Sequence, residues 1–174
     1  ESYEESLPMH YFDACTLSAE EFTGQITNAL KHGFRPATSH LALGEAIGSE
    51  LFKLKKIEEE LRLAKRGSNR IELLSREVEA KIELIMHILK LARSMRVVGN
   101  DAPPEIVKQF LHGSGATSLE TADAVNIATA IQIGCEKFFT TDLNFKGEKF
   151  KENTKNISKK YNTKILEIVY KELI

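Results

Sequence analysis

Four acidic residues stand where the sequence otherwise predicts a buried, apolar environment. Asp13 and Asp142 each follow a short apolar run, whereas Glu45 and Asp123 interrupt apolar faces of expected helices. At helical spacing, the neighbours are Leu41, Gly48 and Phe52 for Glu45, and Ile127, Ala130 and Ile131 for Asp123. A carboxylate on an apolar surface is costly unless another group compensates its charge. These four positions therefore call for a chemical explanation.

Each acid alone has an ordinary structural explanation. An Asp at a strand end is often a turn former or a helix cap, and a buried Glu or Asp is often paired with a basic residue. Together, however, four carboxylates without basic partners would repel one another unless a divalent cation lay among them. Oxygen ligands without His or Cys favour Mg²⁺ or Mn²⁺ over zinc, and Mg²⁺ retains water and open positions for phosphate. The pattern predicts hydrolysis of a nucleic-acid phosphodiester.

The distribution of charge is consistent with a polyanionic substrate. The formal net charge is −1. Residues 53–96 hold 12 Lys and Arg against 7 Asp and Glu, a net charge of +5, and residues 146–174 hold 8 against 4, a net charge of +4. The remainder holds 4 against 14, a net charge of −10. An acidic centre between two basic segments would attract a polyanion, although solvated helix faces explain each segment equally well.

The hydrophobic pattern alternates between short strands and helices. Strands are expected at residues 9–17, 34–39, 95–99, 136–141 and 163–169. Two long helices, from His40 to the break at 67–69 and from there to about Arg93, predict a helical hairpin over about 50–94. The apolar stripe expected on the second helix is Ile71, Leu74, Val78, Ile82, Ile85 and Leu89. The alternation predicts a three-layer α/β/α fold with a parallel sheet of about five strands.

The length of 174 residues favours one domain, expected over residues 9–174. Residues 1–8 are polar and acidic, and we expect a flexible end or a remnant added for expression. No run of about 18 apolar residues is present, so no membrane span is expected. The two cysteines, Cys15 and Cys135, have no metal-ligand spacing, which favours a reducing, cytoplasmic setting.

Three stretches resemble the motifs of PIN-domain ribonucleases, including the VapC-like toxins. They are "YFDACTL", "ATSHLALGEA" and "ADAVNIATAIQIGCEKFFTTDLNF", and the likeness extends over nearly the whole chain from Met9. The long hairpin matches only loosely. The resemblance implies a five-stranded parallel sheet and an acidic, Mg²⁺- or Mn²⁺-dependent site that cleaves single-stranded RNA to leave a 5′-phosphate and a 3′-hydroxyl.

The resemblance also implies which residues of this sequence form the site. By this resemblance, the first to fourth acids are Asp13, Glu45, Asp123 and Asp142, and the supporting positions are Ser39, Thr141 and Asn144. The three aspartates are expected to hold the metal, with Glu45 as a direct or water-mediated ligand that orients the attacking water. Asn144 stands where many relatives have a further acid, which leaves a second metal in question. Cys15 stands two residues after the first acid, where relatives often have Ser or Asn.

The expected partners also follow from this reading. Lys and Arg of the hairpin and of the C-terminal segment would hold the phosphate backbone of single-stranded or structured RNA, without reading its sequence. The resemblance adds an antitoxin and a homodimer as expectations, and the hairpin either caps the sheet or receives an antitoxin helix. The alternative function is a PIN-like module that binds RNA or protein without cutting.

The remaining motifs in the sequence do not predict a second site. The five histidines show no metal-ligand spacing, and His40 is read as a polar residue at a helix start. Residues 112–118 are expected to form a loop in which Thr117 begins a capping box with Glu120, and "HGSGAT" lacks the Lys-Ser/Thr of a phosphate loop. "DACTL" is similar to the first motif of haloacid-dehalogenase phosphatases but lacks their second aspartate. Arg35 is expected at the surface rather than facing the site.

Overall fold

The computed structural model of the protein describes residues 2–111 and 119–173, so the loop expected at 112–118, with the Thr117 cap, lies outside the described residues. Five strands form one sheet: β1 (Met9–Phe12), β2 (Arg35–Ser39), β3 (Arg96–Val98), β4 (Lys137–Thr140) and β5 (Glu167–Tyr170). Every pairing is parallel, and the strand order is β3-β2-β1-β4-β5. The expected α/β fold with a five-stranded parallel sheet is confirmed.

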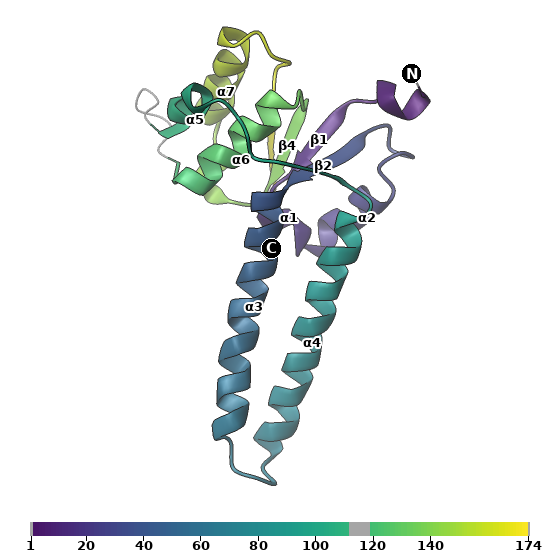
Figure 1. Ribbon diagram of the computed structural model, residues 1–174, viewed down its shortest axis with the longest axis vertical. Coiled ribbons are helices and arrows are strands. Elements are labelled where there is room, and N and C mark those ends of the chain that lie inside the picture. Colours follow the sequence, from purple (N-terminus) through teal and green to yellow (C-terminus); the bar gives the residue numbers. More distant parts are fainter. Residues whose placement is uncertain (1, 112–118, 174) are drawn as a thin grey trace.

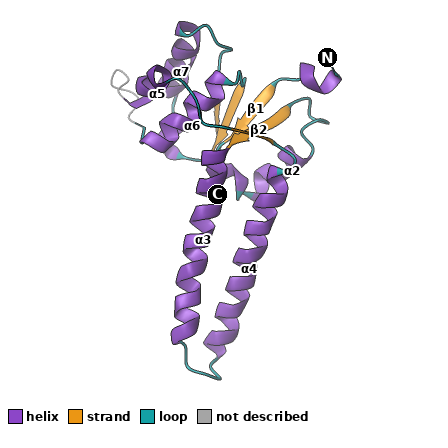
Figure 2. Cartoon of the chain, viewed as in Figure 1, coloured by secondary structure: helices purple, strands orange, loops and turns teal. Residues whose placement is uncertain are grey.

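Helices cover both faces of the sheet, as Figures 1 and 2 show. The elements are η1 (Tyr3–Ser6), α1 (Ala14–Leu17), α2 (Glu20–Thr27), α3 (His40–Leu63), α4 (Asn69–Ala92), α5 (Pro104–Leu111), α6 (Thr121–Gln132), η2 (Leu143–Phe145) and α7 (Glu148–Lys160). Helices α5, α6 and α7 lie on one face, and α1, α2 and the bases of α3 and α4 lie on the other. Within the described residues, no helix is long and apolar enough to cross a membrane.

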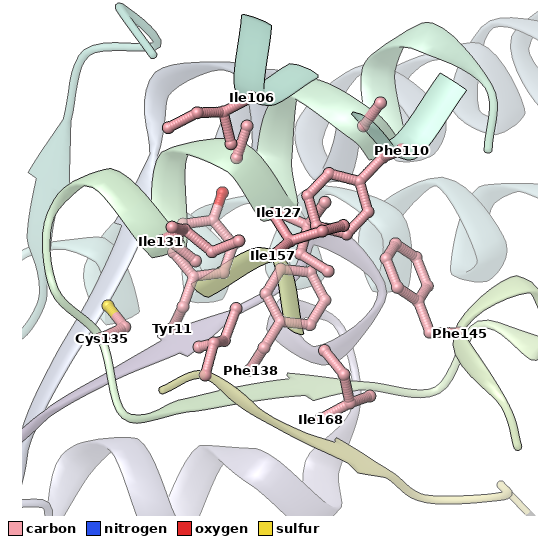
Figure 3. Packing of buried hydrophobic residues seen from close by; sticks show 14 of the residues in the cluster. Tyr11, Ile106, Phe110, Ile127, Ile131, Cys135, Phe138, Phe145, Ile157 and Ile168 are labelled. Carbon is pink, nitrogen blue, oxygen red and sulfur yellow. The ribbon is translucent and has the colours of Figure 1, made fainter. Parts of the chain in front are cut away.

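Two apolar clusters fill the spaces between the sheet and its helical layers. Because side chains alternate between the faces of a strand, Tyr11 of β1 packs toward α6 while Phe12 packs toward α1 and α2. The first cluster is drawn in Figure 3, where Tyr11 and Phe138 lie side by side under Ile127 and Ile131 of α6. The Tyr11 and Phe138 rings stack at 5.1 Å between centroids. This packing fixes α6, which carries Asp123, against the central strands.

The first strand is shorter than the sequence predicts. The apolar run over 9–17 was expected to be one strand, but β1 ends at Phe12 and residues 14–17 form the short helix α1. Asp13 causes the change, because its side chain accepts from the Ala14 N–H and its carbonyl accepts from the Thr16 hydroxyl. The last strand is also displaced, from the expected 163–169 to Glu167–Tyr170. The apolar content was read correctly, but the Asp13 cap decided where β1 ends.

The helical hairpin is confirmed as α3 and α4, and it projects from the sheet as a long stalk (Figure 1). Its seam differs in part from the expected stripe. Leu74 and Ile88 are buried, whereas Ile82 is 47% exposed and Leu89 is 42% exposed. The position beside Ile82 in the seam is taken by Lys81, which pairs with Glu50 of α3. The expected stripe is therefore wrong at Ile82 and Leu89.

Candidate active site

The four predicted acids come to the carboxyl edge of the sheet. Asp13 directly follows β1, and Asp142 follows the adjacent strand β4. Glu45 lies in the second turn of α3, and Asp123 lies in the first turn of α6. Carboxyl ends of parallel strands are where open α/β sheets bind ligands. The sheet order thus gathers residues that are more than 100 positions apart in the sequence.

Asp13 is the most buried of the four, with 3% of its surface exposed. Its Oδ1 accepts from the Ala14 N–H at 2.9 Å, and its Oδ2 accepts from the Thr140 hydroxyl at 3.1 Å. The Cys15 thiol lies 3.6 Å from the same Oδ2. Oδ2 thus accepts two hydrogen bonds, whereas Oδ1 keeps a further lone pair for another partner. Asp13 is therefore held rigidly in place and can still bind a ligand.

The acids act on one another electrostatically. Burial is the main cause that raises the pKa of Asp13 to about 7, and the charges of Asp123 and Glu45 raise it further. Burial likewise raises the pKa of Asp123 to about 6, with contributions from Asp142 and Glu45. Hydrogen bonds from Ala14 and Thr140 oppose the shift at Asp13 without cancelling it. Mutually repelling carboxylates of this kind favour a bound cation.

A chain of buried hydrogen bonds orients Glu45. The Tyr11 hydroxyl donates to Ser39 Oγ at 2.8 Å, and Ser39 Oγ donates to Asn126 Oδ1 at 3.1 Å. The Asn126 amide then donates to Glu45 Oε1 at 2.9 Å. Burial raises the pKa of Tyr11 well above its usual range, so its hydroxyl remains a donor. Glu45 keeps its second oxygen for a water molecule or a cation.

Asn144 joins the two remaining acids. Its backbone N–H donates to Asp142 Oδ1 at 2.9 Å. Its side-chain amide acts as a hydrogen-bond donor to Asp123 and opposes the rise in the pKa of that carboxyl. Asp142 in turn caps the short helix η2. The amide therefore lies beside Asp123 and Asp142, at the position where the resemblance would place a further acid.

The donor set suits a hard divalent cation, although the carboxylates do not form a closed ligand cage. Within residues 2–111 and 119–173, no three His, Cys, Asp or Glu side chains form a compact cluster of metal ligands. The four acids are neighbours that repel one another, and their donors are all oxygens. A cation such as Mg²⁺ retains several of its own water molecules and is bound through one or two carboxylates. The chemistry of the site therefore fits Mg²⁺ or Mn²⁺ bound partly through water.

The structure also shows positioning residues that the sequence analysis did not identify. Thr140 donates its hydroxyl to Asp13, whereas Thr141, expected as a supporting position, contributes its backbone N–H to Cys15 Sγ at 3.3 Å. Tyr11 and Asn126 were also missed. Asn126 is the longest polar side chain in the buried part of "ADAVNIATAI", and that anomaly was a usable signal.

Arg35 and His40 lie outside the group of four acids. Arg35 begins β2 at the amino edge of the sheet, and its Nε donates to the Leu7 carbonyl at 3.0 Å. Arg35 therefore lies away from the acidic edge, as expected, but it is half-buried and not fully at the surface. His40 is exposed at the first position of α3, as expected for a polar residue at a helix start.

Comparison with protein-family models found no match for the chain, and comparison with curated proteins found none either.

Proposed function

We propose that the protein is a Mg²⁺- or Mn²⁺-dependent ribonuclease of the PIN type that hydrolyses phosphodiester bonds in single-stranded RNA. One observation carries the proposal. Asp13, Glu45, Asp123 and Asp142 lie at the carboxyl edge of the sheet, where burial and, beyond it, the charges of neighbouring acids raise the pKa of Asp13 and of Asp123. The resemblance of the surrounding motifs to PIN-domain ribonucleases supports the same function.

Each residue has a role that follows from its position. Asp13, Asp123 and Asp142 would hold the cation, which when bound supplies an activated water and stabilises the charge of the phosphate. Glu45, oriented by Asn126, would accept a hydrogen bond from the attacking water and align it. Thr140 and Ser39 hold their neighbours rigid, so the site is arranged before the substrate arrives.

The proposed setting is a reducing compartment such as the cytoplasm. Cys15 and Cys135 are both free thiols, and Cys135 is fully buried. Free buried cysteines are typical of proteins kept under reducing conditions.

The test is cleavage of single-stranded RNA in the presence of Mn²⁺ or Mg²⁺ by the wild type and by the Asp13→Asn variant. Asparagine is nearly isosteric with aspartate but lacks the charge, so we expect Asp13→Asn to fold and to lose cleavage to background. The matched control is Glu167→Gln, which removes an exposed acid at the amino edge of the same sheet and should leave cleavage unchanged. If the wild type cuts several RNAs no faster than Asp13→Asn does, the protein is not a nuclease.

A second candidate function is a PIN-like module that binds RNA or protein without cutting. Asn144 in place of a further acid favours it, as do the apolar side chains that the hairpin exposes. These exposed residues are Leu51, Phe52, Leu63, Leu73, Ile82, Met86 and Leu89. An antitoxin helix docked there would inhibit an active enzyme, whereas a non-catalytic module would bind its partner with no cleavage to inhibit.

A further inference from the structure

We propose that a cleft along α3 binds a backbone phosphate close to the one that is cleaved, and that Lys53 is the residue that contacts it. This inference rests on the proposed nuclease function and specifies where the RNA lies. The cleft has a volume of about 330 Å³ and runs between α1, α3 and the residue that follows β4. Its polar lining includes Ser18, Glu45, Ser49, Glu50, Lys53 and Thr141.

The cleft leads directly away from the acidic centre. Glu45, Ser49 and Lys53 are spaced four residues apart, so they line one face of α3 in successive turns. Lys53 is eight residues beyond Glu45, which corresponds to about 12 Å along a helix. A chain that has its scissile phosphate at the acids would therefore bring a phosphate a short way along the same strand to Lys53.

Lys53 has a charge available for a ligand. Glu50 is shared by two ammonium groups, with Lys81 Nζ at 2.8 Å and Lys53 Nζ at 3.2 Å. The side chain of Lys81 is 27% exposed and that of Lys53 is 54% exposed. Burial raises the pKa of Glu50, but the two lysines outweigh it, so the pKa is lowered and the group is anionic. Two ammonium charges against one carboxylate leave a net charge of +1.

The shorter bond to Lys81 satisfies Glu50 when Lys53 turns away. Lys53 is therefore the member of the cluster that can move its Nζ toward a phosphate in the cleft without leaving a buried carboxylate unpaired. Glu45, the member of the four acids that lines the cleft, repels a phosphate unless a cation is bound, and Lys53 is the positively charged residue of the lining. An RNA strand would be held at two points, at the acidic centre and at Lys53.

The experiment is steady-state cleavage of an unstructured oligouridylate with Mn²⁺ by the wild type, Lys53→Met, Lys53→Arg and Lys55→Met. Lys55 is exposed on the same helix but does not line the cleft, so it controls for the loss of one charge. We expect Lys53→Met to raise KM about tenfold with kcat unchanged, because a phosphate contact supplies binding rather than chemistry. Lys53→Arg should restore KM, and Lys55→Met should behave like the wild type.

The salt dependence gives a second readout that a structural role would not change. The slope of log(kcat/KM) against log[KCl] should become shallower by about 0.7 in Lys53→Met, the value for one phosphate contact to a single strand. If the wild type cleaves but Lys53→Met and Lys55→Met are indistinguishable in KM and slope, the cleft is not the phosphate site and the nuclease function stands. If the wild type does not cleave, both proposals are wrong.

Discussion

At the scale of single residues, the central feature is a carboxylate placed where its charge is unfavourable. Asp13 is buried beside Asp123 and Glu45, and its pKa is about 7 instead of 3.8. Hydrogen bonds from Ala14 and Thr140 hold its two oxygens but do not neutralise the charge. The arrangement costs stability in the metal-free protein and becomes favourable when a cation binds.

Because of this cost, the free energy of unfolding of the metal-free protein should depend on pH. Between about pH 4 and pH 7 the folded state retains a proton on Asp13 that the unfolded chain has released. Since the folded state then binds more protons, its free energy of unfolding should decrease as the pH rises through this range, by at most about 4 kcal/mol. Asp123, whose pKa is raised to about 6, adds a change of the same sign.

The measurement is urea unfolding in EDTA from pH 4 to pH 8, for the wild type and for Asp13→Asn. The variant has no proton to lose at this position, so its slope should be flatter. Mn²⁺ should stabilise the wild type more at pH 8 than at pH 5, because protons compete with the metal for the carboxylates. Equal slopes for the two proteins would show that Asp13 titrates normally.

At the scale of elements, the α3–α4 hairpin holds an ion pair inside its seam. Glu50 is 4% exposed and is bonded to Lys81 of the other helix, at positions where the neighbouring seam residues are Leu54, Leu74 and Ile88. A buried ion pair is a weak source of stability, but it penalises any register in which its two charges are separated. The pair therefore fixes how α3 and α4 align, and through α3 it fixes the direction of the cleft.

Removing one partner of this pair should be more harmful than removing both. Lys81→Met leaves Glu50 with Lys53 alone and should lower the free energy of unfolding by about 2 kcal/mol, less than for a fully buried pair because Lys81 is partly exposed. The double variant Glu50→Leu/Lys81→Leu should be close to the wild type. The exposed pair Glu72–Arg76 is the control, and Arg76→Ala should cost no more than about 0.5 kcal/mol. Urea denaturation measures all three, and a double variant that is less stable than Lys81→Met would contradict this account.

At the scale of the whole molecule, the protein consists of an α/β body and a stalk with different charge. The stalk beyond its base, residues 57–74, holds four Lys and Arg and four Asp and Glu, so its net charge is zero. The excess of basic residues in the hairpin lies at its base, where Lys53 lines the cleft beside Glu45. We therefore expect the cleft side of the base, rather than the tip of the stalk, to contact RNA.

Shortening the stalk tests this division. Replacing residues 57–74 by a short Gly-Ser turn retains Glu45, Glu50, Lys53 and Lys81, and the two apolar clusters of the body include no residue of the deleted segment. We expect the shortened protein to fold and to cleave RNA within about twofold of the wild type, since no net charge is lost. Cleavage rates and far-UV circular dichroism measure the two outcomes. A large loss of cleavage in a folded protein would place RNA contacts on the tip.

The sequence alone determined the fold class and the types of residues in the site. Apolar periodicity and turn residues predicted five strands, the helical hairpin and a parallel sheet, because these signals are local and follow from side-chain spacing. The same local rules failed where capping or pairing intervened, as at Asp13, which ends β1 early, and at Lys81, which enters the seam in place of Ile82.

The tertiary structure alone decided which groups touch. The strand order places β1 beside β4, so Thr140 rather than Thr141 donates to Asp13. The packing of α6 on β1 joins Tyr11, 115 residues away in sequence, to Asn126. The cleft beside Glu45 exists because α1 and α3 meet next to the end of β4. Contacts between residues so distant in sequence depend on the assembled layers, and spacing along the chain contains no measure of them.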